Sequence, residues 1–233
     1  MNCLRSLYYI KKINNKYKKY GLTTILIHPP EWAFEKNTKN ILYFLKKSKV
    51  KFPVIIDKNK KIIKKLKVNF WPSQLLIRDK KILYQHIGEG NYKKLEKNIA
   101  KFLKVKTKKI FNKEPMYRKF PTIYCGKRKN EKIKFLNDKL KFGVIYVDNN
   151  WNQKYEYIKS SKNRATLILL VKGKIVNFIA ESLNKKHSKV KVMINDKFIK
   201  NLTIDKPQLY NIMKLKKTDK KNKLTITTDN NLA

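Results

Sequence analysis

Apolar side chains in the first twenty-eight residues recur at two different spacings, which predicts a helix followed by a strand. Over residues 4–20 they return every three or four positions and form one apolar stripe on a helix, with Gly21 as its C-cap. Residues 22–27 are instead a continuous apolar run, as in a buried parallel strand, which the His28-Pro29-Pro30 segment ends. The stripe consists of Leu4, Leu7, Ile10, Ile13, Tyr17 and Tyr20.

The same two spacings predict six further elements up to about residue 104. Helices and strands alternate until a two-residue turn, Asp79-Lys80, joins two strands as a hairpin. The order is that of an α/β domain. The predicted elements are a helix over 38–48, a strand over 53–56, a short helix over 62–66, strands over 73–78 and 81–87, and a helix over 92–102.

The second half of the chain reads as strands separated by regular turn signals. This pattern predicts an antiparallel β-sandwich, jelly-roll-like in type. We therefore divide the chain into an α/β domain over 1–104, a linker containing Lys and Pro over 105–121, and a β-sandwich over 122–233. The clearest predicted strands are 166–171, 175–180, 190–194, 198–204, 209–215 and 224–228.

The net charge of +42 on 233 residues raises the question of a polyanionic partner. Nearly all of this charge is lysine spread along the whole chain, since only five residues are arginine. Arginine is the residue that reads phosphates and bases bidentately, and no zinc-finger spacing or RNA-binding signature is present. We interpret the charge as a compositional drift to lysine on solvated faces. It predicts non-specific binding to polyanions at low salt and no specific nucleic-acid partner.

Other residue types exclude several classes of protein. No run approaches the roughly 20 apolar residues that cross a bilayer, and the first residues form an amphipathic helix rather than a signal peptide. These features predict a cytoplasmic location if Met1 is the true start. The three histidines lack ligand spacing, so we assign no metal and no cofactor, and we interpret Cys125 as a structural residue.

Several short motifs, in order over nearly the full chain, resemble those of the TlpA/DipZ-type thioredoxin-like proteins. Residues 28–36 resemble H-T-P-E-F-A-F-E-K, residues 70–72 resemble Y-W-P, and residues 86–92 resemble H-F-G-E-G-x-Y. Asn2-Cys3-Leu4-Arg5 resembles the end of C-x-N-C-x-R. The later matches are residues 121–126 with T-P-E-I-Y-x-G, Trp151 and Glu156-Tyr157 with W…E-Y, and residues 207–210 with P-R-L-Y.

The resemblance implies a thioredoxin-like domain followed by a carbohydrate-binding-module-like β-sandwich. It also implies thiol–disulfide exchange that serves extracytoplasmic protein thiols or cytochrome c maturation. The implied partners are protein thiols or disulfides and a DsbD/CcdA-like membrane electron donor, and the implied location is extracytoplasmic or membrane-associated.

Cys3 occupies the position of the second cysteine of the family's C-x-x-C site, at the start of the first helix. A helix N-terminus there stabilises a thiolate. The first cysteine and the strand that should carry it are lacking in this chain, which leaves monothiol chemistry. The alternative is a redox-inactive two-domain protein-binding module that docks partners near Pro72 and on the sandwich face. Without its first strand, the sheet should also expose unpaired backbone groups and be marginally stable.

The resemblance assigns substrate positioning to Trp71 and Pro72, and it implies a cis bond before Pro72. Glu31 and Glu35 are candidate accessory proton acceptors, although N-capping of the next helix explains Glu35 equally well. Glu89 starts a helix, where the helix dipole alone favours an anion, and we interpret His86 as structural. In the sandwich, Trp151, Tyr155 and Tyr157 form either a sugar-stacking platform or ordinary packing, and we favour packing.

Overall fold

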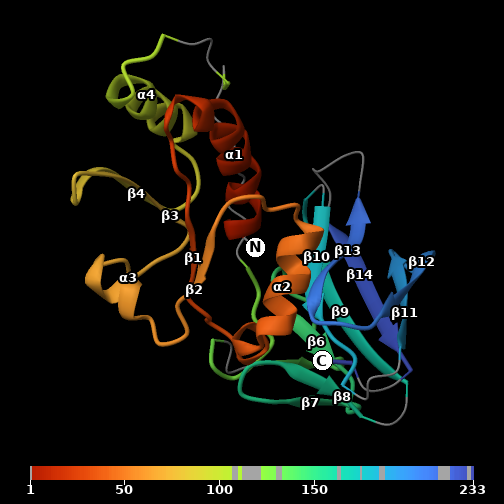
Figure 1. The fold of residues 1–233 in the computed structure, drawn as a ribbon. Helices are drawn as coiled ribbons and strands as arrows, with labels where there is room; N and C mark the ends of the chain where they lie inside the picture. The colour runs from red at the N-terminus through yellow and green to blue at the C-terminus, as the bar shows by residue number, and fades with distance from the viewer. Residues whose placement is uncertain are drawn as a thin grey trace. The chain divides into compact units, whose positions relative to one another are not determined.

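The computed structural model forms two compact units, coloured along the chain in Figure 1. The first unit comprises Met1–Glu31 and Ile41–Arg118, and the second comprises Trp32–Asn40 and Lys119–Ala233. Residues 107–109 and 112–121, most of the predicted linker, lie outside the described residues. The described residues are 2–106, 110–111, 122–129, 133–161, 164–173, 175–183, 187–214, 221–229 and 232–233.

The first half of the chain forms its helices and strands close to where the apolar pattern predicts them. The largest difference is in β1, which begins at Leu26 rather than at residue 22, because its partner β2 offers only three residues, from Val54 to Ile56, for pairing. Gly21 adopts a left-handed φ of 92° and ends the first helical segment as predicted. The elements are α1 (Asn2–Tyr17), η1 (Lys18–Tyr20), β1 (Leu26–His28), η2 (Ala33–Lys36), α2 (Thr38–Lys47), β2 (Val54–Ile56), α3 (Lys61–Lys65), β3 (Ser73–Arg78), β4 (Lys81–Ile87) and α4 (Tyr92–Phe102).

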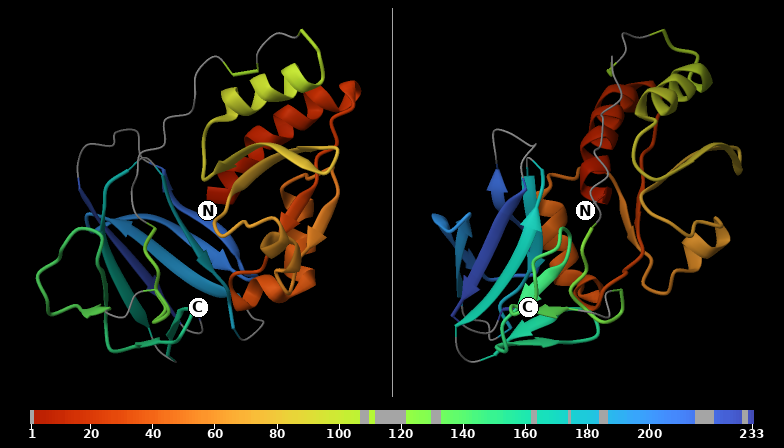
Figure 2. Two further views of the ribbon diagram at one scale, coloured as in Figure 1. Left: turned by 90° about the vertical axis from the view of Figure 1, so that its left-hand side faces the viewer. Right: turned by 180° about the vertical axis from the view of Figure 1, so that it is seen from behind.

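The four strands of the first unit form two separate pairs instead of one sheet. Strands β1 and β2 are parallel, and β3 and β4 are an antiparallel hairpin. Between the pairs, the described residues contain no strand that bonds β1 to β3. In both Figure 1 and the right-hand view of Figure 2, β1 lies on the side of its pair nearer to β3. That the pairs belong to a thioredoxin-like sheet lacking its first, central strand stays a prediction.

The core of the first unit lies where α1 packs against α4. Ile13 and Tyr17 from α1 meet Leu95 and Ile99 from α4, and all four are buried. The ring of Tyr9 stacks on that of buried Tyr92 with a centroid separation of 4.3 Å. Most of the apolar stripe predicted on the first helix therefore faces the core, whereas its last member, Tyr20 in η1, is exposed. The N-terminus of α1 is held in place by packing farther along the helix.

The second unit is rich in β-strands, as predicted, and strands of two sheets contribute to one buried cluster. A six-stranded sheet runs in the order β12-β11-β14-β9-β6-β5, and the β10–β13 pair contributes Ile212 and Met213 to the same buried cluster. All its strand pairs are antiparallel except β5 with β6, which are parallel. A closed sandwich stays a prediction. The strands are β5 (Lys134–Phe135), β6 (Ile145–Val147), β7 (Trp151–Gln153), β8 (Ile158–Ser160), β9 (Ala165–Val171), β10 (Ile175–Ala180), β11 (Ser188–Ile194), β12 (Lys197–Ile204), β13 (Gln208–Lys214) and β14 (Asn222–Thr228).

Candidate thiol site at the start of α1

Cys3 lies in the first turn of α1 and is exposed. The first turn carries no acidic residue that would offset the positive end of the helix dipole. Backbone N–H groups in a first turn have no partner within the helix, so they favour negative charge nearby. The position therefore suits a thiolate nucleophile.

Arg5 links this helix start to the loop between β4 and α4. Its Nε donates to Glu89 Oε2 at 3.0 Å, and its Nη2 donates to Glu89 Oε1 at 2.6 Å. The Glu89 side chain is only 9% exposed, whereas that of Arg5 is 45% exposed. A bidentate pair of this kind fixes direction as well as distance. Glu89 is thus an ion-pair partner of α1 and not only a favourable charge at the start of α4.

The same loop contacts the segment that carries Pro72. The Gly88 N–H donates to the Pro72 carbonyl oxygen at 2.7 Å, and the Trp71–Pro72 peptide bond is cis. Gly88 has a φ of 98°, a left-handed conformation that glycine adopts without strain. A short series of contacts thus runs from the helix of Cys3 through Arg5, Glu89 and Gly88 to the cis-proline.

Trp71 is oriented by Glu31, because its Nε1 donates to Glu31 Oε2 at 3.2 Å. The structure therefore brings together Trp71, Pro72 and Glu31, all of which the sequence singled out. Glu31 acts here as a hydrogen-bond acceptor for the indole, so a role in proton transfer stays a prediction. The His86 ring contacts the Glu89 carbonyl at 3.3 Å and Asn91 at 3.0 Å, which agrees with a structural role.

Glu35 belongs to the second unit. Its carboxylate accepts the Trp32 N–H at 3.1 Å at the start of η2, so it caps the short helix that contains it rather than the predicted helix over 38–48. Trp32 itself stacks on Tyr124 and lies under the Arg128 guanidinium, with the guanidinium carbon 4.8 Å from the ring centroid. The next residue, Ala33, donates its N–H to Glu156 Oε2 at 2.8 Å. These contacts account for the membership of residues 32–40 in the second unit.

The sequence did not single out Arg5 and Glu89 as a pair. Both occur in matched motifs, C-x-N-C-x-R and H-F-G-E-G-x-Y, but 84 residues separate them. Both motifs are expected at one site, and one contains an arginine and the other a glutamate. This opposite charge is the signal from which the pair could have been predicted.

Cys125 lies in a different environment from Cys3. It packs against the buried cluster of Ile145, Val147 and Ile158, and burial raises the pKa of its thiol to about 11. At pH 8 only about one molecule in a thousand would carry the Cys125 thiolate, whereas an ordinary thiol is roughly one-quarter ionised. This agrees with a structural role for Cys125.

We expect iodoacetamide to alkylate Cys3 at least about 100-fold faster than Cys125 at pH 8, because the thiolate is the reacting species. The rate at Cys125 should climb as the pH approaches 11. Peptide mass spectrometry after timed quenching measures both rates in one sample, and labelling in denaturant provides the reference in which the two rates converge. Equal rates in the native chain would contradict the assignment of Cys125 to the core.

The described residues contain no gathering of three His, Cys, Asp or Glu side chains that could hold a metal ion. Nor does that part of the chain contain a helix both long and apolar enough to span a membrane.

Comparisons with known proteins find similar sequences for the first part of the chain. Residues 2–103 match the Redoxin family model. Protein DipZ of Mycobacterium tuberculosis is 30% identical over 105 residues, which are 44% of this chain and 15% of that protein. Thiol-disulfide oxidoreductase ResA of Bacillus cereus is 35% identical over 100 residues, 42% of this chain and 55% of that protein. The chain thus matches only a small part of DipZ and about half of ResA. Residues 2–103 are therefore a redoxin domain of the thioredoxin-like kind, distantly homologous to DipZ and ResA, and a β-rich region follows it.

Proposed function

We propose that this chain carries out thiol–disulfide exchange with protein thiols or disulfides, with Cys3 as the reacting thiol. The observation that carries the proposal is the position of an exposed cysteine in the first turn of α1, tied through Arg5, Glu89 and Gly88 to the cis-Pro72 loop. The name of the relative ResA, thiol-disulfide oxidoreductase, supports the same chemistry.

In the proposed reaction, the Cys3 thiolate attacks one sulfur of a substrate disulfide. A Cys3–substrate disulfide forms, the substrate S–S bond breaks, and the second substrate sulfur leaves as a thiolate that takes a proton from water. A thiol from a second molecule then attacks the mixed disulfide and releases Cys3. We assign this step to an outside thiol because Cys125, the only other cysteine, is half-buried and its raised pKa leaves it mostly protonated.

Residues around Cys3 are assigned supporting roles. Pro72 and Trp71 position the extended backbone of the substrate, and Glu31 holds the Trp71 indole through its hydrogen bond. The Arg5–Glu89 ion pair holds the start of α1 and the loop after β4 in a fixed relative position. We propose that the substrates are extracytoplasmic protein thiols, including those of cytochrome c maturation, and that a DsbD/CcdA-like membrane protein supplies electrons. The family resemblance supports these last two assignments.

The test is the reduction of insulin by dithiothreitol, with the chain and its Cys3→Ser variant as catalysts. We expect a rate above the uncatalysed reaction with the chain, and no increase with Cys3→Ser, because Cys3 is exposed whereas the half-buried Cys125 thiol has a raised pKa. Cys125→Ser is the matched control and should retain the activity. If neither the chain nor Cys125→Ser exceeds background while the chain still binds an unfolded peptide, the redox-inactive binding module is correct.

A further inference from the structure

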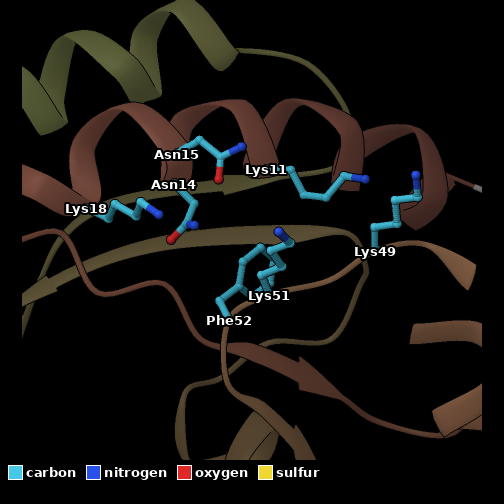
Figure 3. A pocket seen from close by; sticks show the side chains of 7 residues that line it. All are labelled: Lys11, Asn14, Asn15, Lys18, Lys49, Lys51 and Phe52. Atoms are coloured by element: carbon cyan, nitrogen blue, oxygen red, sulfur yellow. The ribbon is translucent and has the colours of Figure 1, made fainter. Parts of the chain in front are cut away.

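A basic pocket lies in the first unit between the C-terminal half of α1 and the segment that joins α2 to β2 (Figure 3). Its volume is about 450 Å³. Four residues at helical spacing on α1 and the start of η1 form one wall, and Lys49, Lys51 and Phe52 face them across the cavity. That wall consists of Lys11, Asn14 and Asn15 from α1 and Lys18 from η1. A smaller cavity of about 230 Å³ shares five of these residues and extends the space towards Thr23 and Thr24.

The electrostatics of this basic pocket favour an anion. Four of the seven lining residues are lysines and none is acidic. Among the described residues no carboxylate pairs with Lys18, Lys49 or Lys51, and Lys11 donates to the Ser48 carbonyl oxygen at 2.8 Å. Helix α1 ends at Tyr17 and helix α2 ends at Lys47, next to the lining residues Lys18 and Lys49. Each helix C-terminus contributes about half a negative charge. The net charge facing the cavity is therefore roughly +3.

Asn14 provides a second, independent observation. Asn14 is only 8% exposed, yet its side chain makes no hydrogen bond to the described residues. Figure 3 shows the Asn14 amide directed into the cavity. Its amide atoms are not among the described buried polar atoms that lack a partner, so the amide is open to the cavity and available to a ligand. The amide can donate to a ligand oxygen, and the buried ring of Phe52 closes the side of the cavity opposite Asn14.

We propose that this basic pocket binds a compact oligophosphate, that is, two or three linked phosphate groups. Lysine ammonium groups are compact point charges that suit phosphate oxygens without a fixed bidentate geometry. A chain of phosphates carries three to four negative charges and matches the lysines in number. The site is separate from the thiol, since Asn14 lies eleven residues after Cys3 on α1, roughly 16 Å along the helix.

The test is isothermal titration calorimetry with tripolyphosphate at about 0.15 M salt, where exposed charges beyond roughly 8 Å are screened. A unit charge about 4 Å from a phosphate in water contributes roughly fivefold in Kd. We therefore expect Lys49→Gln/Lys51→Gln to weaken binding about 25-fold. Asn14→Asp, nearly isosteric, should weaken it similarly by placing a carboxylate in the cavity. Circular dichroism melts establish that each variant is folded.

The matched control is Lys94→Gln/Lys97→Gln, which removes the same charge from the exposed face of α4 and should leave Kd unchanged. Titration with ATP separates the two sources of an oligophosphate. Equal affinities would assign the site to the phosphate chain alone, and tighter ATP binding would extend it to a nucleotide. Equal losses in both double variants, no binding of tripolyphosphate, or tighter binding of an RNA oligonucleotide to the same lysines would each overturn the proposal.

Discussion

Adding one β-strand to the N-terminus should raise the melting temperature of the chain by at least about 10 °C. The variant would carry five apolar, β-branched residues and a four-residue polar loop before Met1. The strand is expected to enter between β1 and β3, which belong to separate two-stranded pairs. A strand in that place would convert the two pairs into one continuous sheet.

The expected size of the effect follows from the groups that the strand would satisfy. Each backbone hydrogen bond formed contributes about 1 kcal/mol net, and each buried aliphatic side chain about 1.5–3 kcal/mol. Ordering five residues opposes this by about 1–2 kcal/mol per residue. A surplus of several kcal/mol remains, and each 1 kcal/mol shifts the midpoint of a 60–100-residue domain by about 4–8 °C.

A Gly/Ser extension of the same length is the control, because it cannot bury apolar side chains and should leave the midpoint unchanged. Melts followed by circular dichroism at low salt compare the three proteins. A cooperative transition of the unextended chain well above about 65 °C, the upper range for mesophilic domains, would contradict the idea that a core strand is lacking. So would equal midpoints for the two extensions.

Placing a cysteine directly before Met1 in the strand-bearing variant should increase insulin reduction by at least about 100-fold over the same extension with serine. The new cysteine would lie three positions before Cys3 and complete a C-x-x-C site at the start of α1. It would attack the substrate disulfide, and Cys3 would then attack the new cysteine's sulfur, release the reduced substrate and leave a disulfide within the site.

The gain arises because the second step becomes intramolecular. Oriented groups in one site reach effective concentrations of about 10⁵–10⁸ M, whereas dithiothreitol is present at millimolar concentration. Dithiothreitol would then be needed only to reduce the disulfide between the new cysteine and Cys3, which restores the dithiol.

Local patterns predicted most of the redoxin domain. The stripe on α1, the hairpin of β3 and β4, and the cap at Gly21 depend on neighbouring residues, so the sequence contains their signals. The cis bond before Pro72 was expected from a three-residue motif and is present.

Contacts between distant residues were not predictable in the same way. Arg5 and Glu89 are 84 residues apart, and Ala33 and Glu156 are 123 residues apart. Neither pair has a local spacing that marks it, because tertiary folding brings the partners together. For this reason the sequence left Glu35 open between an accessory role and helix capping, and its hydrogen bond with the Trp32 N–H is a local contact within the second unit.

The most direct test of Cys3 as a thioredoxin-like active-site cysteine is insulin reduction by the strand-bearing variant with cysteine before Met1. The same protein carrying Cys3→Ser is the comparison, and both must show the raised melting temperature. The account predicts rapid turnover that Cys3→Ser reduces by about 100-fold or more. A folded two-cysteine variant with no more activity than its Cys3→Ser counterpart would contradict it.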